Sequence, residues 1–364
     1  MPMNGVNIAP KKEKKPRGGK VTLDTNSPRG LNEKQVEHNR QENTNAKIRD
    51  QRENGEDSPT LSTLGGVRAL AWNLESLFEK ITLPGVCEFI RTFDIIALAE
   101  TFTLPNFDFS VKFDDYIPVH WSAERFSTLG RPSGGLAVLF SKKLAPFIEI
   151  IKTNISHIIC LKIARTLFNS TKDLLYVCCY VHPPNSIFYS NKEYDNTMEM
   201  LEQFISEEQA KDDNIDVMIN GDLNARLGDW CYIQDASSSD IAEEEIIFKR
   251  TAQDNQMNPN GKRLIELCHS LNLTPLNGLA EKSFENKFTF ISRRGNSTID
   301  HFLCSPEFLP FVVDYRTINR MESQHLPIMI KMESTSDSNT QKTPQGDIKK
   351  TGGMKRKPKN VKTF

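Results

Sequence analysis

The chain lacks the features that mark membrane and secreted proteins. No apolar run approaches the ~20 residues that a membrane-spanning helix requires, and the N-terminus has no apolar segment of the kind found in signal peptides. The seven cysteines are odd in number and never spaced as Cys-X-X-Cys, which argues against a disulfide framework and for reduced thiols. We therefore expect an intracellular protein that makes no contact with membranes.

Both ends of the chain have few of the residues that build a hydrophobic core. They contain almost no aromatic or clustered aliphatic residues and are rich in Lys, Glu, Asn, Gly and Pro, a composition typical of disorder. Nearly all Phe and Trp residues lie between them. The sequence therefore predicts one folded domain over residues 64–332, a disordered polar and basic N-terminal tail over residues 1–63, and a disordered basic C-terminal tail over residues 333–364.

The predicted domain also lacks bulk positive charge. Residues 1–60 and 331–364 together carry a net charge of +9, which leaves −10 for the remainder. A nucleic-acid ligand would therefore need a local basic groove, the tails, or a divalent cation to offset phosphate repulsion. Part of the acidity falls in residues 231–258, which we interpret as a surface insertion. The basic runs at 11–17 and 355–359 fit nuclear localisation or polyanion binding, but also simple solubilisation, and both interpretations stay open.

What the chain does contain is an alternation of apolar strands and amphipathic helices, which indicates a mixed-sheet α/β sandwich. The pattern predicts strands at 67–73, 94–100, 134–140, 158–163, 174–181 and 216–220, helices at 77–92, 194–209 and 262–271, and a final pair of strands toward Ile330.

One of these strands runs into the most informative stretch of the sequence, residues 217–229. It stops at Gly221 and presents Asp222 and Asn224 two residues apart. On an extended backbone this spacing places a carboxylate and an amide on the same face, where they can handle water and phosphate. A plain strand-to-turn junction would use the same residue types, so the stretch taken alone leaves both interpretations open.

Polar side chains recur at the ends of the predicted apolar strands. Ligand sites of α/β proteins form at strand ends. Oxygen donors without a Cys/His set point to a hard cation such as Mg²⁺ or Mn²⁺ rather than zinc. The residues concerned are Asn73, Glu100, Asp222 with Asn224, and Asp300 with His301.

Together these residues resemble the endonuclease/exonuclease/phosphatase superfamily, which includes apurinic endonucleases and pancreatic-type deoxyribonucleases. The resemblance covers roughly residues 66–331 and implies a four-layer α/β sandwich in which two mixed β-sheets pack face to face with helices outside. The motifs follow the family's order: Trp72-Asn73-Leu74, Ala99-Glu100-Thr101, Tyr180, Asn220-Gly221-Asp222-Leu223-Asn224-Ala225, Phe288-Thr289, Ser297-Thr298-Ile299-Asp300-His301 and Ser323-Gln324-His325.

Within the superfamily the chain looks most like the endonuclease domains of non-LTR retrotransposons. No reverse transcriptase segment follows, so we expect an isolated endonuclease module. The motifs behind this likeness are Ser133-Gly134-Gly135-Leu136-Ala137-Val138-Leu139, residues 157–163, Tyr180-Val181-His182-Pro183-Pro184-Asn185, residues 260–273 and Leu276-Asn277-Gly278.

The resemblance implies a Mg²⁺- or Mn²⁺-dependent DNA endonuclease without a small-molecule cofactor, and it assigns a role to each site residue. Glu100 and Asn73 would hold the metal, and Asp222 would orient and deprotonate the attacking water. Asn224 would hold the phosphate, and His325 would stabilise developing charge. The supporting roles fall to Asp300, which would fix the tautomer of His325, to Tyr180, and to the hydroxyls of Thr289 and Ser297.

Several assignments have structural alternatives. Glu100 could be a surface carboxylate, and Tyr180 a half-buried strand aromatic. His301 could form a local pair with Asp300. His182 fits a loop residue better than a ligand, and Arg131 is as well explained by solvation as by a phosphate contact.

One position departs from the family's pattern. The last motif usually reads Ser-Asp-His, whereas Gln324 stands in the middle here. The amide keeps an oxygen but loses a negative charge, which should weaken cation binding or alter neighbouring pKa values. Two alternatives to a DNA endonuclease follow: a catalytically impaired nucleic-acid-binding relic, or a superfamily phosphoesterase that acts on RNA or another phosphoester.

Overall fold

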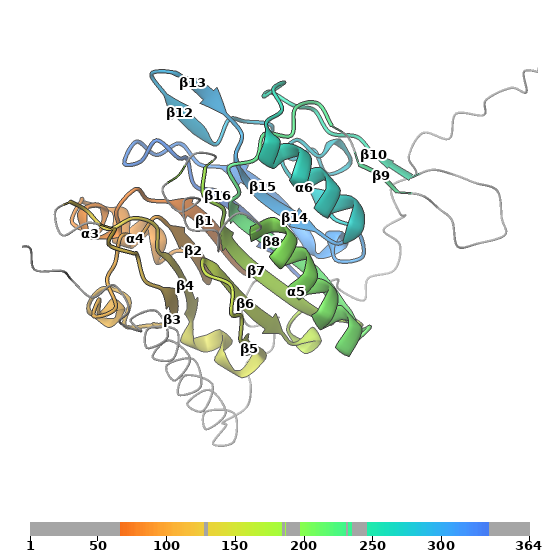
Figure 1. The fold of residues 1–364 in the computed structure, drawn as a ribbon. Coiled ribbons are helices and arrows are strands. Elements are labelled where there is room, and N and C mark those ends of the chain that lie inside the picture. Colours follow the sequence, from red (N-terminus) through yellow and green to blue (C-terminus); the bar gives the residue numbers. More distant parts are fainter. Residues whose placement is uncertain are drawn as a thin grey trace, which may run out of the picture.

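A computed structural model describes residues 66–126, 130–183, 186, 197–230, 232–234 and 246–334. The predicted tails lie outside these residues apart from positions 333 and 334, as does most of the stretch between 231 and 245. Two six-stranded mixed β-sheets form the centre of the described part, with helices on their outer faces (Figure 1).

The first sheet has the strand order β15-β16-β1-β2-β4-β3. Only β1 and β2 run parallel; all other neighbours are antiparallel. Every residue of β2 is buried, which explains its unbroken apolar sequence. The strands are β1 (Val67–Asn73), β2 (Ile95–Ala99), β3 (Tyr116–Trp121), β4 (Leu136–Ser141), β15 (Val312–Thr317) and β16 (Ile328–Met332).

The second sheet repeats this plan with the order β11-β14-β8-β7-β6-β5, and again one pair, β7 with β8, is parallel. Both central strands are buried almost throughout. The strands are β5 (Ile148–Ile151), β6 (Ile158–Ile163), β7 (Asp173–Tyr180), β8 (Ile215–Asp222), β11 (Thr274–Pro275) and β14 (Asp300–Cys304). Two separate hairpins pair β9 (Tyr232–Gln234) with β10 (Ile246–Phe248) and β12 (Phe290–Ser292) with β13 (Gly295–Ser297).

Three apolar layers hold the architecture together. The largest lies between the two sheets and includes Ala97, Val138 and Leu161. A second, with Leu201 and Leu264, joins the outer face of the second sheet to α5 (Thr197–Lys211) and α6 (Pro259–Ser270), and a third covers the first sheet with α3 (Leu77–Lys80) and α4 (Val86–Ile90). The predicted four-layer α/β sandwich is therefore confirmed. Short 3₁₀ segments complete the connections: Phe109–Val111, Lys142–Phe147, Arg165–Leu167, Ala280–Lys282 and Leu309–Phe311.

The single helix expected over residues 77–92 is wrong. The segment forms α3 and α4 with a break between them. Pro84 has no backbone N–H to donate, and Gly85 takes a left-handed φ of 77°, which together interrupt a continuous helix.

The acidic stretch at 231–258 also differs from a simple surface insertion. Asp254 is buried and forms an ion pair with Arg226, and it also accepts backbone N–H groups from Thr298 and Gln256. Arg250 donates to the backbone carbonyls of residues 228, 230 and 277. At least its C-terminal part is therefore integrated into the fold.

Six cysteines lie among the described residues; all are free, and Cys178 and Cys179 are buried in β7. None of the described helices combines the length and apolarity needed to cross a membrane.

Candidate active site and metal centre

Strand register brings three of the predicted site residues side by side. Asp222 ends β8, with Asp300 of β14 opposite it on one side and Tyr180 of β7 on the other. Gly221 precedes Asp222 with a φ of +132°, and a Cβ at this position would lie 2.0 Å from the carbonyl oxygen of Cys179. Only glycine therefore fits where β8 delivers its carboxylate.

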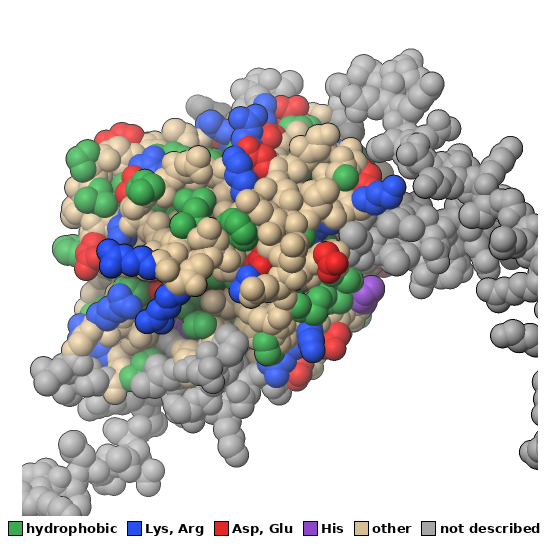
Figure 2. Space-filling view, turned by 90° about the horizontal axis from the view of Figure 1, so that it is seen from above, with side chains coloured by type: hydrophobic (Ala, Val, Ile, Leu, Met, Phe, Trp, Pro, Cys, Tyr) green, Lys and Arg blue, Asp and Glu red, His purple; other side chains and the backbone are tan. Residues whose placement is uncertain are grey.

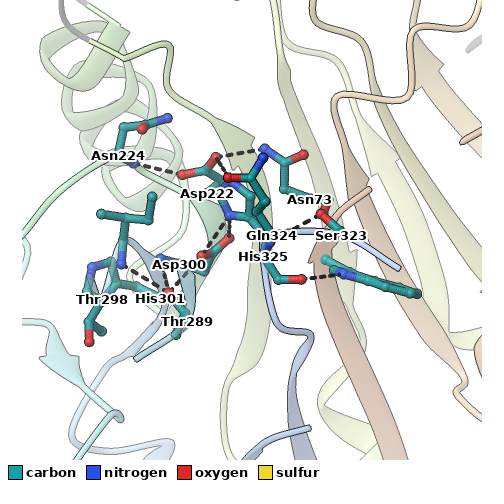
Figure 3. Close-up of polar contacts among 12 residues, drawn as sticks. Asn73, Asp222, Asn224, Thr289, Thr298, Asp300, His301, Ser323, Gln324 and His325 are labelled. Atoms are coloured by element: carbon teal, nitrogen blue, oxygen red, sulfur yellow. Dashed lines mark hydrogen bonds and ion pairs between the residues drawn. The ribbon is translucent and has the colours of Figure 1, made fainter. Parts of the chain in front are cut away.

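Asp222 is buried and receives a hydrogen bond on each of its oxygens. Asn73, at the end of β1 in the other sheet, donates its Nδ2 to Oδ2 at 2.9 Å. The backbone N–H of Asn224 donates to Oδ1 at 3.0 Å (Figure 3). A polar link between the two sheets thus fixes the carboxylate.

Asn224 is placed differently from the same-face geometry expected of an extended strand. Strand β8 ends at Asp222, and Asn224 has a left-handed φ of 46°. Its Nδ2 donates to the carbonyl of Val181 at 2.9 Å. Asn224 therefore contacts Asp222 through its backbone, and its side chain is anchored on the strand β7 side.

His325 is buried between two carboxylates. Its Nδ1 lies 3.1 Å and 3.0 Å from the two oxygens of Asp300, while its Nε2 lies 3.9 Å from Oδ2 of Asp222. Thr289 donates its hydroxyl to Asp300 at 2.7 Å, and Trp72 donates its indole N–H to the carbonyl of His325 at 2.9 Å (Figure 3). These contacts fix the ring with Nε2 directed toward Asp222.

Glu100 and Tyr180 form a second pair beside this network. The hydroxyl of Tyr180 donates to Oε1 of Glu100 at 2.7 Å. Tyr180 is 4 % exposed, so its interpretation as a half-buried strand aromatic is wrong. The charge of Glu100 raises the pKa values of both Asp222 and His325, which identifies it as an electrostatic neighbour of the network.

The pKa values of Asp222 and His325 are both raised. Burial, and then the charge of Asp300, raise the pKa of Asp222 to about 7. Burial alone would lower the pKa of His325, but the charges of Asp300 and Asp222 outweigh it and raise this pKa well above its ordinary value. The imidazolium form of His325 is thus stabilised between two carboxyl groups, one of which is poised near neutral pH.

The donor set suits a hard divalent cation. Among the described residues, the ligand atoms of Asp222, Asp300 and His325 lie within 4.8 Å of one another. His325 and Asp300 are already bonded to each other, so the oxygen donors of Glu100 and Asn73 are the better candidates to hold a metal at the edge of this group. The donors of this group are carboxylate, amide and imidazole rather than thiolate, which fits Mg²⁺ or Mn²⁺.

Glu75 was missed in the sequence, and Ser323 was named there only as part of the last motif, without a role for its hydroxyl. The Oγ of Ser323 lies 2.8 Å from the carbonyl of Asn73 and 2.9 Å from Oε2 of Glu75. Gln324 also donates to Glu75 through its backbone and its side chain. The spacing Asn73-x-Glu75, which places a carboxylate two residues beyond a strand end, is the signal that could have revealed Glu75.

Other candidate residues lie apart from the network. His301 is buried and donates Nε2–H to the carbonyl of Ala225 at 2.7 Å, so it supports the β8–β14 connection. His182 lies in the loop after β7, as predicted, and it is buried there with its ring 4.6 Å from that of Tyr180. Ser297 accepts the N–H of Thr289 through its backbone carbonyl, and no hydrogen bond joins its hydroxyl to the network among the described residues. Arg131 is exposed, and its guanidinium lies 4.6 Å from the ring centre of Phe102.

A comparison of the sequence with known families identifies the fold's relatives. A profile described as the Endonuclease/Exonuclease/phosphatase family matches residues 70–323. The chain belongs to this family. The match spans both sheets and extends to Ser323, so the membership expected from the motifs is confirmed. A search of curated protein sequences gave no match.

Solved structures of similar fold include several nucleic-acid enzymes. The AP endonuclease LMAP of Leishmania major superposes with a TM-score of 0.56 at 13% identity, over 74% of this chain and 88% of that one. The 3′-5′ exonuclease NExo of Neisseria meningitidis follows with 0.48 at 17% identity over 73% and 99%. The endonuclease domain of TRAS1, a telomere-specific non-LTR retrotransposon, gives 0.46 at 15% identity over 74% and 98%. At these identities the likeness concerns the fold alone.

Proposed function

We propose that the chain is a divalent-metal-dependent DNA endonuclease that hydrolyses phosphodiester bonds, nicks one strand and leaves a 3′-hydroxyl. The observation that carries this proposal is the buried hydrogen-bond network Asn73–Asp222 and Asp300–His325 beside the Glu100–Tyr180 pair. It combines a carboxylate poised near neutrality, a charged histidine and oxygen donors for a cation, which are the groups that phosphodiester hydrolysis requires.

Each residue takes a role from its position. Asp222 deprotonates and orients the attacking water, since Asn73 and the backbone of Asn224 fix its oxygens. His325 directs Nε2 at the phosphate, and Asp300 holds its Nδ1 proton. The second N–H of the Asn224 amide is left to donate to the phosphate, because the other N–H is bonded to Val181.

Glu100 and Asn73 would hold the metal, with Tyr180 orienting Glu100. A bound Mg²⁺ or Mn²⁺ would supply positive charge that stabilises the phosphate as negative charge develops on it. The side-chain oxygen Oδ1 of Asn73 already accepts the N–H of Glu75 at 3.0 Å, which orients this oxygen.

The surface supports DNA as substrate only through local features. Figure 2 shows Lys and Arg side chains in separate groups among acidic and apolar ones, rather than one continuous basic area. Arg131 lies two residues from the β-bridge Glu124–Ser133 and over Phe102, two residues beyond Glu100. We infer that a metal ion and a few such arginines offset the phosphate charge. The retrotransposon-type motifs favour DNA over other phosphoesters, and a retrotransposon-derived origin for the chain.

The experiment that tests the proposal is nicking of supercoiled plasmid by the full chain with Mg²⁺, with Mn²⁺ and with EDTA. Open-circular DNA is expected with either metal and not with EDTA, and the nicks should prime a DNA polymerase directly because they end in 3′-hydroxyls. Equal nicking with EDTA, or nicks that need phosphatase treatment before extension, would contradict it.

Gln324 favours a second candidate, a nucleic-acid-binding relic without catalysis. This alternative predicts binding of duplex DNA in a mobility-shift assay but no nicking with either metal. A third, a phosphoesterase on RNA or another phosphoester, predicts turnover of such a substrate by the same preparation while plasmid stays supercoiled.

We further propose that the protein acts in the nucleus and that the basic runs at 11–17 and 355–359 are its nuclear localisation signals. Both runs lie outside the described residues. A fluorescent fusion should concentrate in the nucleus and lose this distribution when the Lys and Arg residues of both runs are changed to Gln. An unchanged distribution would show that these runs are not the localisation signals.

A further inference from the structure

Glu75 has an unusual backbone conformation and contacts both Asn73 and the loop that carries His325. Its φ of 51° is left-handed, and Ser76 follows with 120°, conformations that non-glycine residues adopt only when surrounding contacts impose them. Those contacts are the bond from its own N–H to Oδ1 of Asn73 and the bond from the N–H of Ser76 to the carbonyl of Glu100 at 2.9 Å. The backbone at Glu75 is therefore fixed against both candidate metal-holding residues.

The carboxylate of Glu75 binds the loop that carries His325. Its Oε2 accepts the backbone N–H of Gln324 at 2.9 Å and lies 2.9 Å from the hydroxyl of Ser323. Its Oε1 accepts the side-chain amide of Gln324 at 3.3 Å. The N–H of His325 in turn donates to Oγ of Ser323 at 3.2 Å. One carboxylate thus fixes three consecutive residues that end in the histidine.

We propose that Glu75 is a positioning residue for His325 and that Gln324 is its matched partner. The two positions form one carboxylate–amide pair, in which the carboxylate and the amide can change places. The inference rests on the proposed function. An amide at position 324 can donate to Glu75, whereas an aspartate there would face Glu75 with like charge at close range. With Glu75 present, the pair still carries one negative charge. The departure at Gln324 is then an adaptation to Glu75 and not by itself a sign of lost activity.

A double-mutant cycle tests the pair. The variants are Glu75→Gln, Gln324→Asp and the double variant that exchanges carboxylate and amide, with Glu75→Ala to remove the contact and Glu79→Ala, an exposed glutamate on α3, as matched control. Single-turnover nicking gives the rate and the DNA concentration dependence, and thermal unfolding without metal gives a readout independent of activity.

Glu75→Ala should lower the nicking rate roughly 10–100-fold with little change in the DNA concentration for half-maximal rate, as expected for loss of a group that orients a catalytic side chain. Glu75→Gln should retain part of the rate because its amide oxygen still accepts hydrogen bonds. Gln324→Asp should lower both the rate and the metal-free melting temperature, and the exchanged double variant should recover both. Glu79→Ala should match wild type.

Two results would overturn the inference: Gln324→Asp alone raising the rate at unchanged melting temperature, or a double variant whose losses are the sum of the single ones. If wild type fails to nick, the proposed function fails. The melting temperatures of wild type and the five variants still test the Glu75–Gln324 pair, since recovery in the double variant does not depend on catalysis.

Discussion

Asp300 binds His325 through both carboxylate oxygens, at 3.1 Å and 3.0 Å from Nδ1. This contact joins a strand of the second sheet to a loop that precedes the last strand of the first. Because Nδ1 is engaged, Nε2 is the ring nitrogen that faces Asp222. The pair therefore sets both the tautomer and the charge of the histidine.

Asp300→Asn should reduce the nicking rate by roughly 10²–10⁴-fold, because the amide no longer stabilises the imidazolium and can select the wrong tautomer. Single-turnover plasmid nicking measures the rate. Thr289→Val loses the 2.7 Å bond to Asp300 and the bonds from the backbone N–H groups of Ile299 and Asp300. It should lower the nicking rate less than Asp300→Asn does. A rate for Asp300→Asn within a factor of three of wild type would show that this pair is structural.

Tyr180→Phe should weaken metal binding, because it removes the hydrogen bond that orients Glu100. Loss of such an orienting contact typically costs 10–100-fold in metal affinity. The Mg²⁺ concentration for half-maximal nicking measures it. Tyr176→Phe is the matched control on the same strand, since its buried hydroxyl has no hydrogen-bond partner among the described residues. An equal shift of this Mg²⁺ concentration in both variants would show that the Tyr180 hydroxyl has no specific role in metal binding.

His301 should make the fold less stable in acid. Burial lowers its pKa to about 4, so between pH 6.5 and 4 the unfolded chain takes up a proton that the folded chain does not. The free energy of unfolding should fall by about 3 kcal/mol from this residue as pH drops through that window, and stay constant above it. Urea unfolding of wild type and His301→Gln, whose amide can still donate to Ala225, isolates the effect as the difference between the two curves. Parallel curves would mean that His301 titrates normally.

Arg131→Ala should weaken DNA binding without slowing the chemical step. The guanidinium stacks on Phe102 close to Glu100, where it can meet one backbone phosphate. Removing one such contact should lower the slope of log affinity against log salt concentration by about 1. Fluorescence anisotropy on a duplex oligonucleotide at several salt concentrations measures the slope. Lys142→Ala, on the 3₁₀ segment after β4, is an exposed control that should leave it unchanged.

The sequence predicted those parts of the fold and site that depend on local pattern. The apolar strands were found because burial on both faces leaves continuous hydrophobic runs, and strand-end carboxylates such as Asp222 and Glu100 followed from them. The pairing register that places Asp300 and Tyr180 on either side of Asp222 could not be read from one sequence, since it depends on contacts distant in the chain.

Local reasoning failed where the backbone leaves regular geometry. Asn224 was expected on the face of an extended strand, but the strand ends two residues earlier and a left-handed residue turns the side chain to Val181. Glu75 was missed for the same reason, since its contact with Gln324 spans about 250 positions and depends on two residues with positive φ. The effect of Gln324 could be judged only once that contact was known.

The measurement that tests the account most directly is single-turnover nicking of supercoiled plasmid in Mg²⁺ by wild type and Asp222→Asn. The amide preserves size, and its single oxygen can still accept from one of the two donors, Asn73 or the backbone of Asn224, but it cannot take a proton from water. We predict Mg²⁺-dependent nicking by wild type and a loss of at least roughly 10²-fold in the variant, with a cooperative thermal transition retained. Nicking by Asp222→Asn at the wild-type rate would contradict the role of this carboxylate and the proposed function built on it.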